Sequence, residues 1–481
     1  MAPVDANFRN NVQGDLFSRG FPKIHETYYF FSIVQETVFP QKLTDLGKSN
    51  EISNLTKVLD DWKKVDATPK GEIIDVCNAL IAFSMEGLRK IQAGLGGDDL
   101  KLAKIKISDP AFFLGMKQED PSKMHDPPLE EWHPLFGQDI HGLLKIAGSD
   151  PAIINTKLHN IKAILGHGTV INDIVYSSEP TTENSRVDGQ VRPKDKQLNG
   201  REHFGFEDAI SQPLLEGIDD IDRPAVFAKD VLMHTAQRVI TASNDPPGLH
   251  PKPEAQGNAF KRPDWMFDGS FLVFRKLEQD VAGFNKFIEQ NHAKAHCDNA
   301  PLFAAKLMGR WPSVAQVHPS SCNFEKDIAT DPKGDNSFKF TDNRICPMAA
   351  HIRKMNPRDD DLQFALNARI IRSGIPYGKE YSEAPTNKRG LLFACYQSSI
   401  DNGFRFLQIA WANKDNFPRD NAGYDVFVAQ RGPHVKLTCN FEGEDHKVTT
   451  ISDISSLVTM KGGEYFFVPS IYALTSKLGK A

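Results

Sequence analysis

Two segments of the chain, which begin about half a chain length apart, share one pattern: an aromatic and β-branched run followed by a stretch with helical spacing. The first is YYFFSIVQETVFPQKL at 28–43, and the second is GSFLVFRKLEQDVAGFNKFI at 269–288. The runs predict buried strands, and Val281, Phe284 and Phe287 recur at three-residue steps, as one helix face requires. Strand-then-helix units are common, so the likeness is either a coincidence or a duplication. A duplication predicts two domains of similar α+β plan.

The composition is that of a folded protein. Of the 481 residues, 40% are hydrophobic and 25% are charged, which supports a large core and more than one domain. The formal net charge of −5 gives no reason to expect a nucleic acid as partner. No apolar run is long enough to cross a bilayer, so no membrane partner is expected.

The six cysteines are scattered and none forms a Cys-x-x-Cys pair. A disulfide framework is therefore not expected, although one or two bridges stay open. The N-terminus MAPVDANFRNNVQGDLF lacks the basic start and the apolar stretch of a secretory signal. It favours the cytoplasm, or a chain whose signal was removed or replaced.

Polar stretches separate the apolar segments. Residues 177–201 predict a polar loop, and residues 243–265, rich in proline and glycine, predict a long surface connection. In the second half, 390–399 predicts a strand and 403–414 a helix. Residues 464–474 predict a terminal strand followed by a short element.

Four strings carry groups suited to chemistry: FGFEDAISQP at 204–213, LMGRWPSVAQV at 307–317, CPMAAHIRKMNPRDD at 346–360 and NARIIRSGIPYG at 367–378. They offer a carboxylate in a tight loop, a histidine beside two bases, and an arginine ahead of a Gly-Ile-Pro-Tyr-Gly turn.

Each of these three side chains also has a structural explanation. Asp208 lies among aromatic residues, where a carboxylate is expensive to desolvate, but aspartates at helix N-caps and turns are common. His351 follows Ala349 and Ala350, which leave room for a flat ligand, but a lone histidine is usually a core residue. Arg372 lies in an expected strand and could form a structural salt bridge.

The strings resemble the dye-decolourising peroxidases, in particular the fungal type. The string AHIRxxNPR of that family is matched in full at 350–358, and the arginine string ending in PYG is matched at 372–378. GRW at 309–311, VQGDLFSRGFPK at 12–23 and the C-terminal YFFVPSIYAL are similar as well, so the resemblance covers nearly the whole chain. The family pattern GxxDG…SQP is matched at Gly205, Asp208, Ser211, Gln212 and Pro213.

The resemblance implies an α+β fold of two ferredoxin-like domains, each an antiparallel β-sheet with peripheral helices, and one haem b between them. An N-terminal domain with the distal aspartate loop is expected at 1–240, a connecting segment at 241–265 and a haem-binding domain at 266–481. The implied function is that of a haem peroxidase. Hydrogen peroxide oxidises the iron to a ferryl intermediate, and one-electron withdrawals from phenols or bulky aromatic dyes return it to rest.

The resemblance also implies roles for single residues. His351 matches the proximal ligand of the haem iron, and Asp425 in GYDVF is the candidate carboxylate on its other ring nitrogen. Arg353 is expected to meet a haem propionate. Asp208 matches the distal acid–base for hydrogen peroxide, and Arg372 matches the distal cation that stabilises charge on the departing oxygen. Carboxylates stay ionised at lower pH than imidazoles, so an acidic optimum is predicted.

Two positions depart from the family pattern. Ala209 replaces the usual glycine, and Gly374 stands where some relatives carry a polar side chain. Because bulky dyes cannot reach a buried haem, Tyr377 and Trp411 are candidate surface oxidation sites, with a packing role as the alternative. The acidic run at 359–361 is either a Mn(II) site or a solvated helix start.

Two other functions stay open. A haem-binding carrier or sensor without turnover would need neither Asp208 nor Arg372. A zinc hydrolase could use His292, His296 and Cys297 if the two histidines lie on one side of a helix, although the metalloprotease glutamate is absent. The expected partners are hydrogen peroxide and aromatic small-molecule reductants, and the chain is expected to be a monomer or a dimer. Fungal relatives suggest an extracellular location, whereas the N-terminus favours the cytoplasm.

Overall fold

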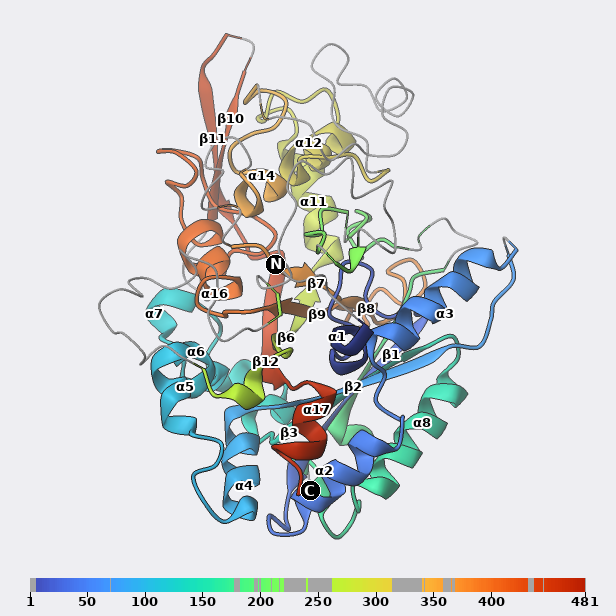
Figure 1. Cartoon of the computed structure of the whole chain (residues 1–481). Coiled ribbons are helices and arrows are strands. Elements are labelled where there is room, and N and C mark those ends of the chain that lie inside the picture. Colours follow the sequence, from blue (N-terminus) through green and yellow to red (C-terminus); the bar gives the residue numbers. More distant parts are fainter. Residues whose placement is uncertain are drawn as a thin grey trace.

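The strands build one large antiparallel sheet (Figure 1). It has ten strands in the order β4-β1-β3-β2-β12-β6-β9-β7, with β5 paired to β1 and β8 paired to β9, and a separate two-stranded sheet joins β10 to β11. The computed structural model describes residues 6–69, 71–176, 182–193, 198, 200–208, 210–215, 217–219, 239–240, 262–313, 340, 342–357, 365, 368–430, 437–443 and 445–480. The strands are β1 His25–Ile33, β2 Cys77–Phe83, β3 Gly142–Gly148, β4 Ile171–Asp173, β5 Arg186–Gln190, β6 Ser270–Gln279, β7 Ile371–Arg372, β8 Ile375–Tyr377, β9 Gly390–Gln397, β10 Leu437–Glu442, β11 Val448–Ile454 and β12 Val458–Val468.

Helices lie around the outside of this sheet, as Figure 1 shows for α2, α4 and α8. Several begin at a side-chain cap: Ser84 caps α4 and Asp150 caps α8. The helices are α1 Ala6–Asn11, α2 Phe39–Lys48, α3 Leu55–Ala67, α4 Met85–Leu95, α5 Leu102–Ser108, α6 Pro110–Leu114, η1 Met116–Gln118, α7 Pro121–Met124, η2 Leu129–Glu131, η3 Pro134–Gly137, α8 Pro151–Ile164, η4 Thr182–Ser185, η8 Asp264–Met266, α11 Val281–Asn291, α12 Ala300–Met308, α14 His351–Met355, α16 Phe404–Phe406, the π-helix η10 Leu407–Ala412 and α17 Ile471–Ser476.

The sheet is assembled from both halves of the chain. Strands β1 to β5 come from the first half, β6 to β9 and β12 come from the second, and the halves join where Phe467 of β12 pairs with Phe83 of β2. The sheet also curls, so that β5, which is paired to β1 at one end, lies against β8, which is paired to β9 at the other end. The approach is close, because a Cβ at Gly189 would be 2.2 Å from Ile375 Cγ2. The expected α+β fold of two ferredoxin-like, antiparallel halves is thus confirmed. The boundaries at 240 and 266 stay a prediction, since most of 220–261 lies outside the described residues.

One hydrophobic core spans both halves. Phe30 of β1 lies 5.3 Å, centroid to centroid, from Phe274 of β6 and 5.4 Å from Phe136. Strands β1 and β6 are not neighbours in the sheet, so their rings meet inside the curl. A second cluster of buried residues lies around α12, Phe427 and the β10–β11 hairpin.

Most of the expected elements are confirmed. The two strand–helix segments are β1 with α2 and β6 with α11, and 390–399 contains β9. The helix expected at 403–414 is α16 followed by η10, and the terminal strand and short element are β12 and α17. The connection expected at 243–265 lies largely outside the described residues.

The prediction of a polar loop over 177–201 was wrong in part, because Arg186–Gln190 forms strand β5, which is paired to β1 on the edge of the sheet. Its inner positions, Val187 and Gly189, are buried, whereas Arg186 and Asp188 alternate outward. Asp188 accepts a hydrogen bond from Thr27 Oγ1 at 2.5 Å. A strand this short and this polar carries no apolar run for a sequence pattern to detect.

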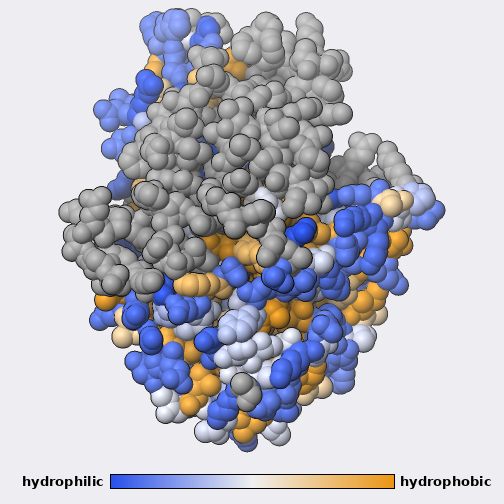
Figure 2. All heavy atoms as spheres, viewed as in Figure 1, coloured by the Kyte–Doolittle hydropathy of each residue, from blue (hydrophilic) through white to orange (hydrophobic). Residues whose placement is uncertain are grey.

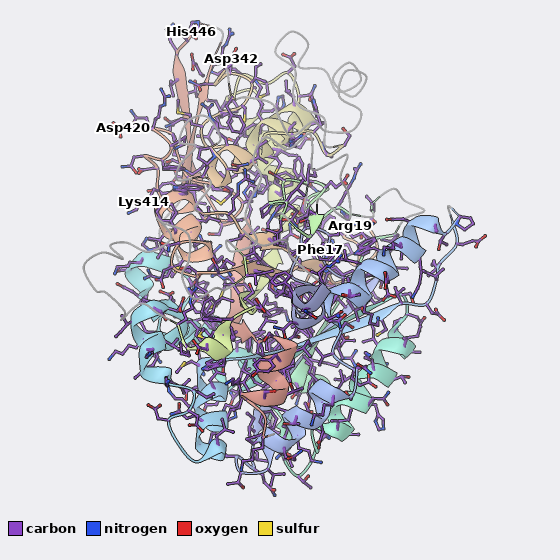
Figure 3. The ribbon with its side chains drawn as sticks, in the orientation of Figure 1. Phe17, Arg19, Asp342, Lys414, Asp420 and His446 are labelled. Atoms are coloured by element: carbon purple, nitrogen blue, oxygen red, sulfur yellow. The ribbon has the colours of Figure 1, made fainter. Side chains whose placement is uncertain are left out.

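No described helix is both long and apolar enough to cross a membrane. Over the face of the molecule in Figure 2, hydrophilic and hydrophobic residues are interspersed wherever the surface is coloured. The β10–β11 hairpin extends away from the large sheet, with His446 at its outer end (Figure 3).

Candidate active site

A large cavity opens between the loop that follows β5 and the second half of the chain. Its volume, counted as the space open to the centres of water molecules, is about 260 Å³. Among the described residues, the first half contributes those from 202–211, and the rest of the lining comes from β6, α14, β7, β9, η10 and their neighbours. The wall is mainly apolar and includes Leu277, Ile352, Leu391, Phe393, Phe427 and Val458.

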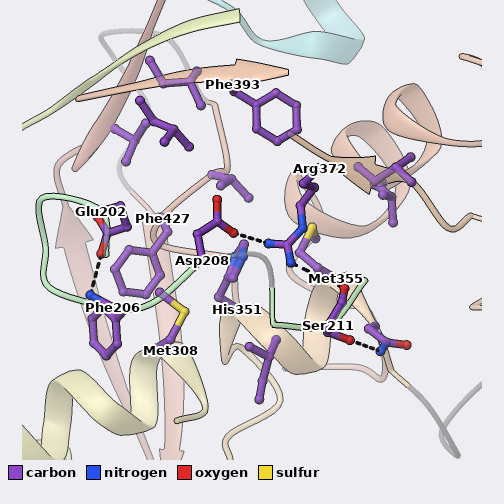
Figure 4. A pocket seen from close by; sticks show the side chains of 18 of the residues that line it. Glu202, Phe206, Asp208, Ser211, Met308, His351, Met355, Arg372, Phe393 and Phe427 are labelled. Carbon is purple, nitrogen blue, oxygen red and sulfur yellow. Dashed lines mark hydrogen bonds and ion pairs between the residues drawn. The ribbon is translucent and has the colours of Figure 1, made fainter. Parts of the chain in front are cut away.

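His351, the first residue of α14, lines this cavity (Figure 4). Its Nδ1 lies 2.8 Å from Asp425 Oδ2, so Nε2 is the ring nitrogen that remains for the cavity. Asp425 is fully buried and accepts hydrogen bonds from the N–H groups of Phe427 and Val428. Burial by itself raises the pKa of Asp425. His351 and these N–H groups lower it by a larger amount, so the pKa ends below 3.8. The carboxylate therefore fixes the tautomer and the orientation of the imidazole.

Asp208 and Arg372 face the same cavity (Figure 4). Arg372 Nη1 donates to Asp208 Oδ1 at 2.6 Å, and the two side chains are 25% and 28% exposed, respectively. The structure thus brings Asp208, Arg372 and His351 to one space, as the sequence strings predict. An acid–base group, a fixed cation and an imidazole backed by a carboxylate are together able to move a proton and to stabilise developing negative charge.

Glu202 sets the conformation of the loop at 200–208, which carries Asp208. Glu202 accepts hydrogen bonds from the N–H groups of Phe204, at 2.8 Å, and Phe206, at 2.9 Å. Asp208 N–H donates to Gly200 O at 3.0 Å and closes the loop. Burial raises the pKa of Glu202, and the hydrogen bonds it accepts offset only part of that rise. These hydrogen bonds within residues 200–208, together with the bond from Arg372, hold Asp208 at the cavity.

Gln212 of the SQP string holds Arg372 by its backbone. Arg372 N–H donates to Gln212 Oε1 at 3.0 Å, and Gln212 Nε2 donates to Arg372 O at 2.5 Å. The side-chain amide therefore pairs with the arginine as a neighbouring strand would. In addition, Arg372 Nη2 lies 3.4 Å from Ser211 O.

The residues present fit a haem. The imidazole Nε2, backed by a buried carboxylate on Nδ1, is the usual protein donor for haem iron, and the apolar walls suit a flat macrocycle. Two arginines of the lining, Arg310 and Arg369, are cations suited to the carboxylates of such a group.

Arg353 does not line the cavity. It is 3% exposed, and its Nη1 donates to Asn343 Oδ1 at 2.9 Å and to Cys346 O at 2.8 Å. Its contact with a propionate stays a prediction.

The surface position expected for Trp411 was wrong. Trp411 is only 2% exposed, and its ring stacks on Phe417 with centroids 4.7 Å apart and planes 5° apart. Tyr377 is half-buried, and its hydroxyl is buried with no hydrogen-bond partner among the described residues. Helical and turn contexts in the sequence do not reveal which way an aromatic ring faces.

The two departures from the family pattern differ in what the structure says of them. Ala209 lies outside the described residues, as does the acidic run at 359–361. At Gly374 a Cβ would lie 2.8 Å from Leu392 O, so the close approach of the chain to β9 leaves no room for a side chain.

The zinc arrangement was wrong. Helix α11 ends at Asn291, so His292 and His296 do not share a helix face. Their ring nitrogens instead contact Cys297 O at 2.9 Å and Thr449 Oγ1 at 2.8 Å. Within the part of the chain that the structure describes, no group of three His, Cys, Asp or Glu residues could hold a metal ion.

Sequence reasoning missed several groups of this site. Glu202 gave no signal, because it lies outside the four strings, and Arg369 was not singled out although it lies in the string at 367–378. Arg310 and Gln212 lie inside quoted strings, yet only the fold shows that Arg310 reaches the cavity and that Gln212 pairs with Arg372.

An antiparallel α+β sheet and a cavity lined by these groups are what a haem peroxidase requires. Two family models match the chain: "DyP dimeric alpha+beta barrel domain" over residues 11–193 and "Dyp-type peroxidase, C-terminal" over residues 252–421. A dye-decolorizing peroxidase of Mycetinis scorodonius is 34% identical over 97% of this chain and 87% of its own length. One from Auricularia auricula-judae is 28% identical over 98% of this chain and 86% of its own length.

Solved structures agree. An ancestral D-type dye-decolorizing peroxidase superposes with a TM-score of 0.79 at 34% identity, with 100% of both chains covered. A dye-decolorizing peroxidase in complex with 2,6-dimethoxyphenol gives a TM-score of 0.75 at 29% identity, over 98% of this chain and 99% of the other. The chain therefore belongs to the dye-decolourising peroxidase family, and it is a haem peroxidase that oxidises aromatic compounds.

Proposed function

We propose that the cavity binds one haem b, that His351 is its iron ligand, and that Asp208 and Arg372 carry the reaction with hydrogen peroxide. The observation that supports this most is the placement of the Asp208–Arg372 ion pair and the His351–Asp425 pair on one apolar cavity. A protein that only carried haem would need the second pair but not the first.

The chain's own residues then have distinct tasks. When bound, haem would supply the redox chemistry: it would give two electrons to hydrogen peroxide and take them back one at a time from reductants. Asp208 accepts one proton of hydrogen peroxide at a carboxylate oxygen and delivers it to the departing oxygen. Arg372 stabilises the negative charge on that oxygen. His351 would hold the haem iron through Nε2. Asp425 keeps the proton on Nδ1, which strengthens the imidazole as an electron donor.

The overall reaction reduces one hydrogen peroxide to two waters and oxidises two phenol or dye molecules by one electron each. A related enzyme was solved with 2,6-dimethoxyphenol, so methoxylated phenols are the first substrates to test. For reductants too bulky for the cavity, Tyr377 stays the candidate relay, because it is half-buried beside Lys276, whose Nζ lies 5.2 Å from the ring.

The experiment is a stopped-flow measurement of the reaction with hydrogen peroxide. Asp208→Asn keeps the shape of the side chain but cannot accept the proton, and we expect its second-order rate constant to fall about 10²–10⁴-fold. Arg372→Leu should fall about 10²–10³-fold. Asp61→Asn, on helix α3, is a control that should keep the wild-type rate. A wild-type rate in Asp208→Asn would refute the role of Asp208 as the base.

A further inference from the structure

The residue after Arg372 is held by a buried cluster of charges that the proposed reaction does not use. Lys145 of β3 is fully buried, and its Nζ donates to Ser373 O at 2.9 Å and to Ser373 Oγ at 2.8 Å. Its counter-ions are Asp15 at 2.6 Å and Glu26 at 3.2 Å, both with fully buried side chains. The lysine thus contacts the backbone immediately after the distal arginine.

Asp15 completes the grip on the same residue. Its two oxygens accept hydrogen bonds from Ser373 Oγ at 3.2 and 3.0 Å, and from Tyr396 OH at 2.5 Å. Phe21 N–H is a further donor to it, at 2.7 Å. The cluster is therefore assembled from the loop after α1, strand β3, strand β9 and the segment after β7, which lie far apart in the sequence.

A second carboxylate balances the charge. Glu26 accepts from Lys23 Nζ at 3.0 Å and from Tyr28 OH at 2.8 Å. Lys23 Nζ also lies 3.3 Å from Ser373 O. With Asp15 and Lys145 the cluster holds two ammonium and two carboxylate groups, so its net charge is zero.

The charges of the central pair are stable in the fold. Burial by itself raises the pKa of Asp15, but Lys145 and Lys23 lower it by a larger amount, so the pKa ends below its usual value. Burial by itself lowers the pKa of Lys145, but Asp15 and Glu26 raise it by a larger amount, so the pKa ends above its usual value. Buried ion pairs add little net stability compared with apolar packing, so the cluster calls for an explanation other than stability.

That explanation lies in the backbone of Arg372 and Ser373. On one side, Gln212 bonds both the N–H and the C=O of Arg372. On the other side, Ser373 N–H donates to Ala394 O at 2.8 Å, and the buried cluster takes its C=O and its hydroxyl. Every backbone polar group of the two residues therefore has a partner. Displacement of a catalytic group by about 1 Å can lower a rate about 10²-fold, so such a restraint has a kinetic consequence.

We infer that Lys145 and Asp15 are positioning residues for the reaction with peroxide, because they fix, through Ser373, the backbone from which Arg372 reaches the cavity. The inference rests on the proposed role of Arg372. It adds to that role a buried ion pair in the first half of the chain that never touches the cavity.

The test uses the haem-loaded protein and the variants Ser373→Ala and Asp15→Asn. Ser373→Ala removes the hydroxyl bonded to both Lys145 and Asp15, and we expect the rate constant with hydrogen peroxide to fall about 10-fold. Fluoride affinity, measured by absorption titration of the resting protein, should fall several-fold, since a bound anion relies on the same distal cation. Oxidation of a dye by protein already treated with peroxide should stay unchanged, because Arg372 acts before that step.

Asp61→Asn is the matched control. Asp61 is 5% exposed and bonded to Lys57 at 2.8 Å and to Asn78 at 3.0 Å, but none of these groups contacts Ser373. This control should leave the peroxide rate and the fluoride affinity at wild-type values. If it lowers both as Ser373→Ala does, the effect is general destabilisation and the inference is wrong.

The inference is also overturned if Ser373→Ala keeps a peroxide rate and a fluoride affinity within about twofold of wild type. Should Asp15→Asn fail to fold, Ser373→Ala decides alone. Arg372→Leu separates the catalytic role of Arg372 from the positioning role of Lys145 and Asp15. If it loses peroxide reactivity while Ser373→Ala does not, the proposed function stands and the positioning role falls. If Arg372→Leu keeps full reactivity, the proposed role of the arginine falls first.

Discussion

Four buried carboxyl groups among the described residues represent two kinds of environment. Asp15 and Asp425 lie against a lysine or an imidazole, and their pKa values are lowered. Glu202 and Glu464 accept hydrogen bonds from backbone N–H groups, and burial raises the pKa of both above 4.5. For an acid of the second kind, the native state binds the proton more tightly than the unfolded state. Its stabilising contribution is complete below the unfolded pKa and is lost as pH rises through the folded pKa.

Glu464→Gln tests this sign. Glu464 Oε1 accepts the N–H groups of Met116 and Tyr465, both at 2.8 Å, and an amide oxygen can do the same without charge. We expect the variant to lose less stability than wild type as pH rises above 4.5. The measurement is the thermal midpoint by circular dichroism from about pH 4 to about pH 8. Glu130→Gln, at an exposed position, is the control, and a midpoint difference that does not change with pH would contradict the prediction.

At this scale the sequence identified side chains better than it identified their surroundings. Asp208, His351 and Arg372 stand in strings whose chemistry is visible, and the fold brings them to one cavity. Asp425 was proposed from GYDVF, and the structure places it 2.8 Å from His351. Trp411 was misplaced because the direction of its ring depends on packing against Phe417, a contact that no local pattern encodes.

Among the elements, α14 is short and owes its position to a lysine. Lys354 is fully buried, and its Nζ donates to the carbonyl groups of Lys414, Phe417 and Gly423 at 2.7, 2.6 and 2.7 Å. These bonds tie the helix that begins with His351 to the loop that leads to Asp425. No sequence pattern predicts them, because the acceptors are main-chain atoms about 60 residues away.

Lys354→Met removes the donor and leaves these carbonyl groups buried without it. A buried acceptor that loses its partner costs about 1–3 kcal/mol, and we expect a total loss of about 3–5 kcal/mol in the free energy of unfolding. Urea unfolding measures it. Lys414→Met changes an exposed lysine of the same loop (Figure 3) and should stay within about 0.5 kcal/mol of wild type. Equal losses in both variants would show that the hydrogen bonds of Lys354 do not anchor the helix.

Strand–helix pairs could be predicted from sequence and strand β5 could not, for one physical reason. β1 and β6 each contain a continuous buried run of aromatic and aliphatic residues, at 28–31 and 271–274, which a local pattern detects. β5 needs only Val187 and Gly189 inside, and its polar residues are satisfied by Thr27 and by solvent. Edge strands follow the register of their neighbour, which a local pattern does not contain.

At the scale of the whole molecule, contacts among the described residues join the two halves, so we expect them to unfold as one cooperative unit. The main core cluster includes residues of β1 to β3 together with residues of β6, β9 and β12. The two halves also share the sheet at Phe467, and the loop from 202 to 211 completes a cavity built by the second half. The repeated strand–helix pattern, if it reflects a duplication, predicted two domains of similar plan, but only the strand order shows that the two halves form a continuous sheet.

Phe467→Ala tests that cooperativity. Phe467 is fully buried, pairs with Phe83, and has its ring centroid 5.3 Å from those of Trp265 and Phe271. We expect a loss of about 3–5 kcal/mol, seen by hydrogen exchange as equal deprotection of peptides from β1 and from β9. Phe441→Ala, in the separate β10–β11 sheet, should instead deprotect mainly that hairpin. If Phe467→Ala deprotects β9 and leaves β1 unchanged, the halves unfold independently, and the shared sheet does not couple the first half to the cavity.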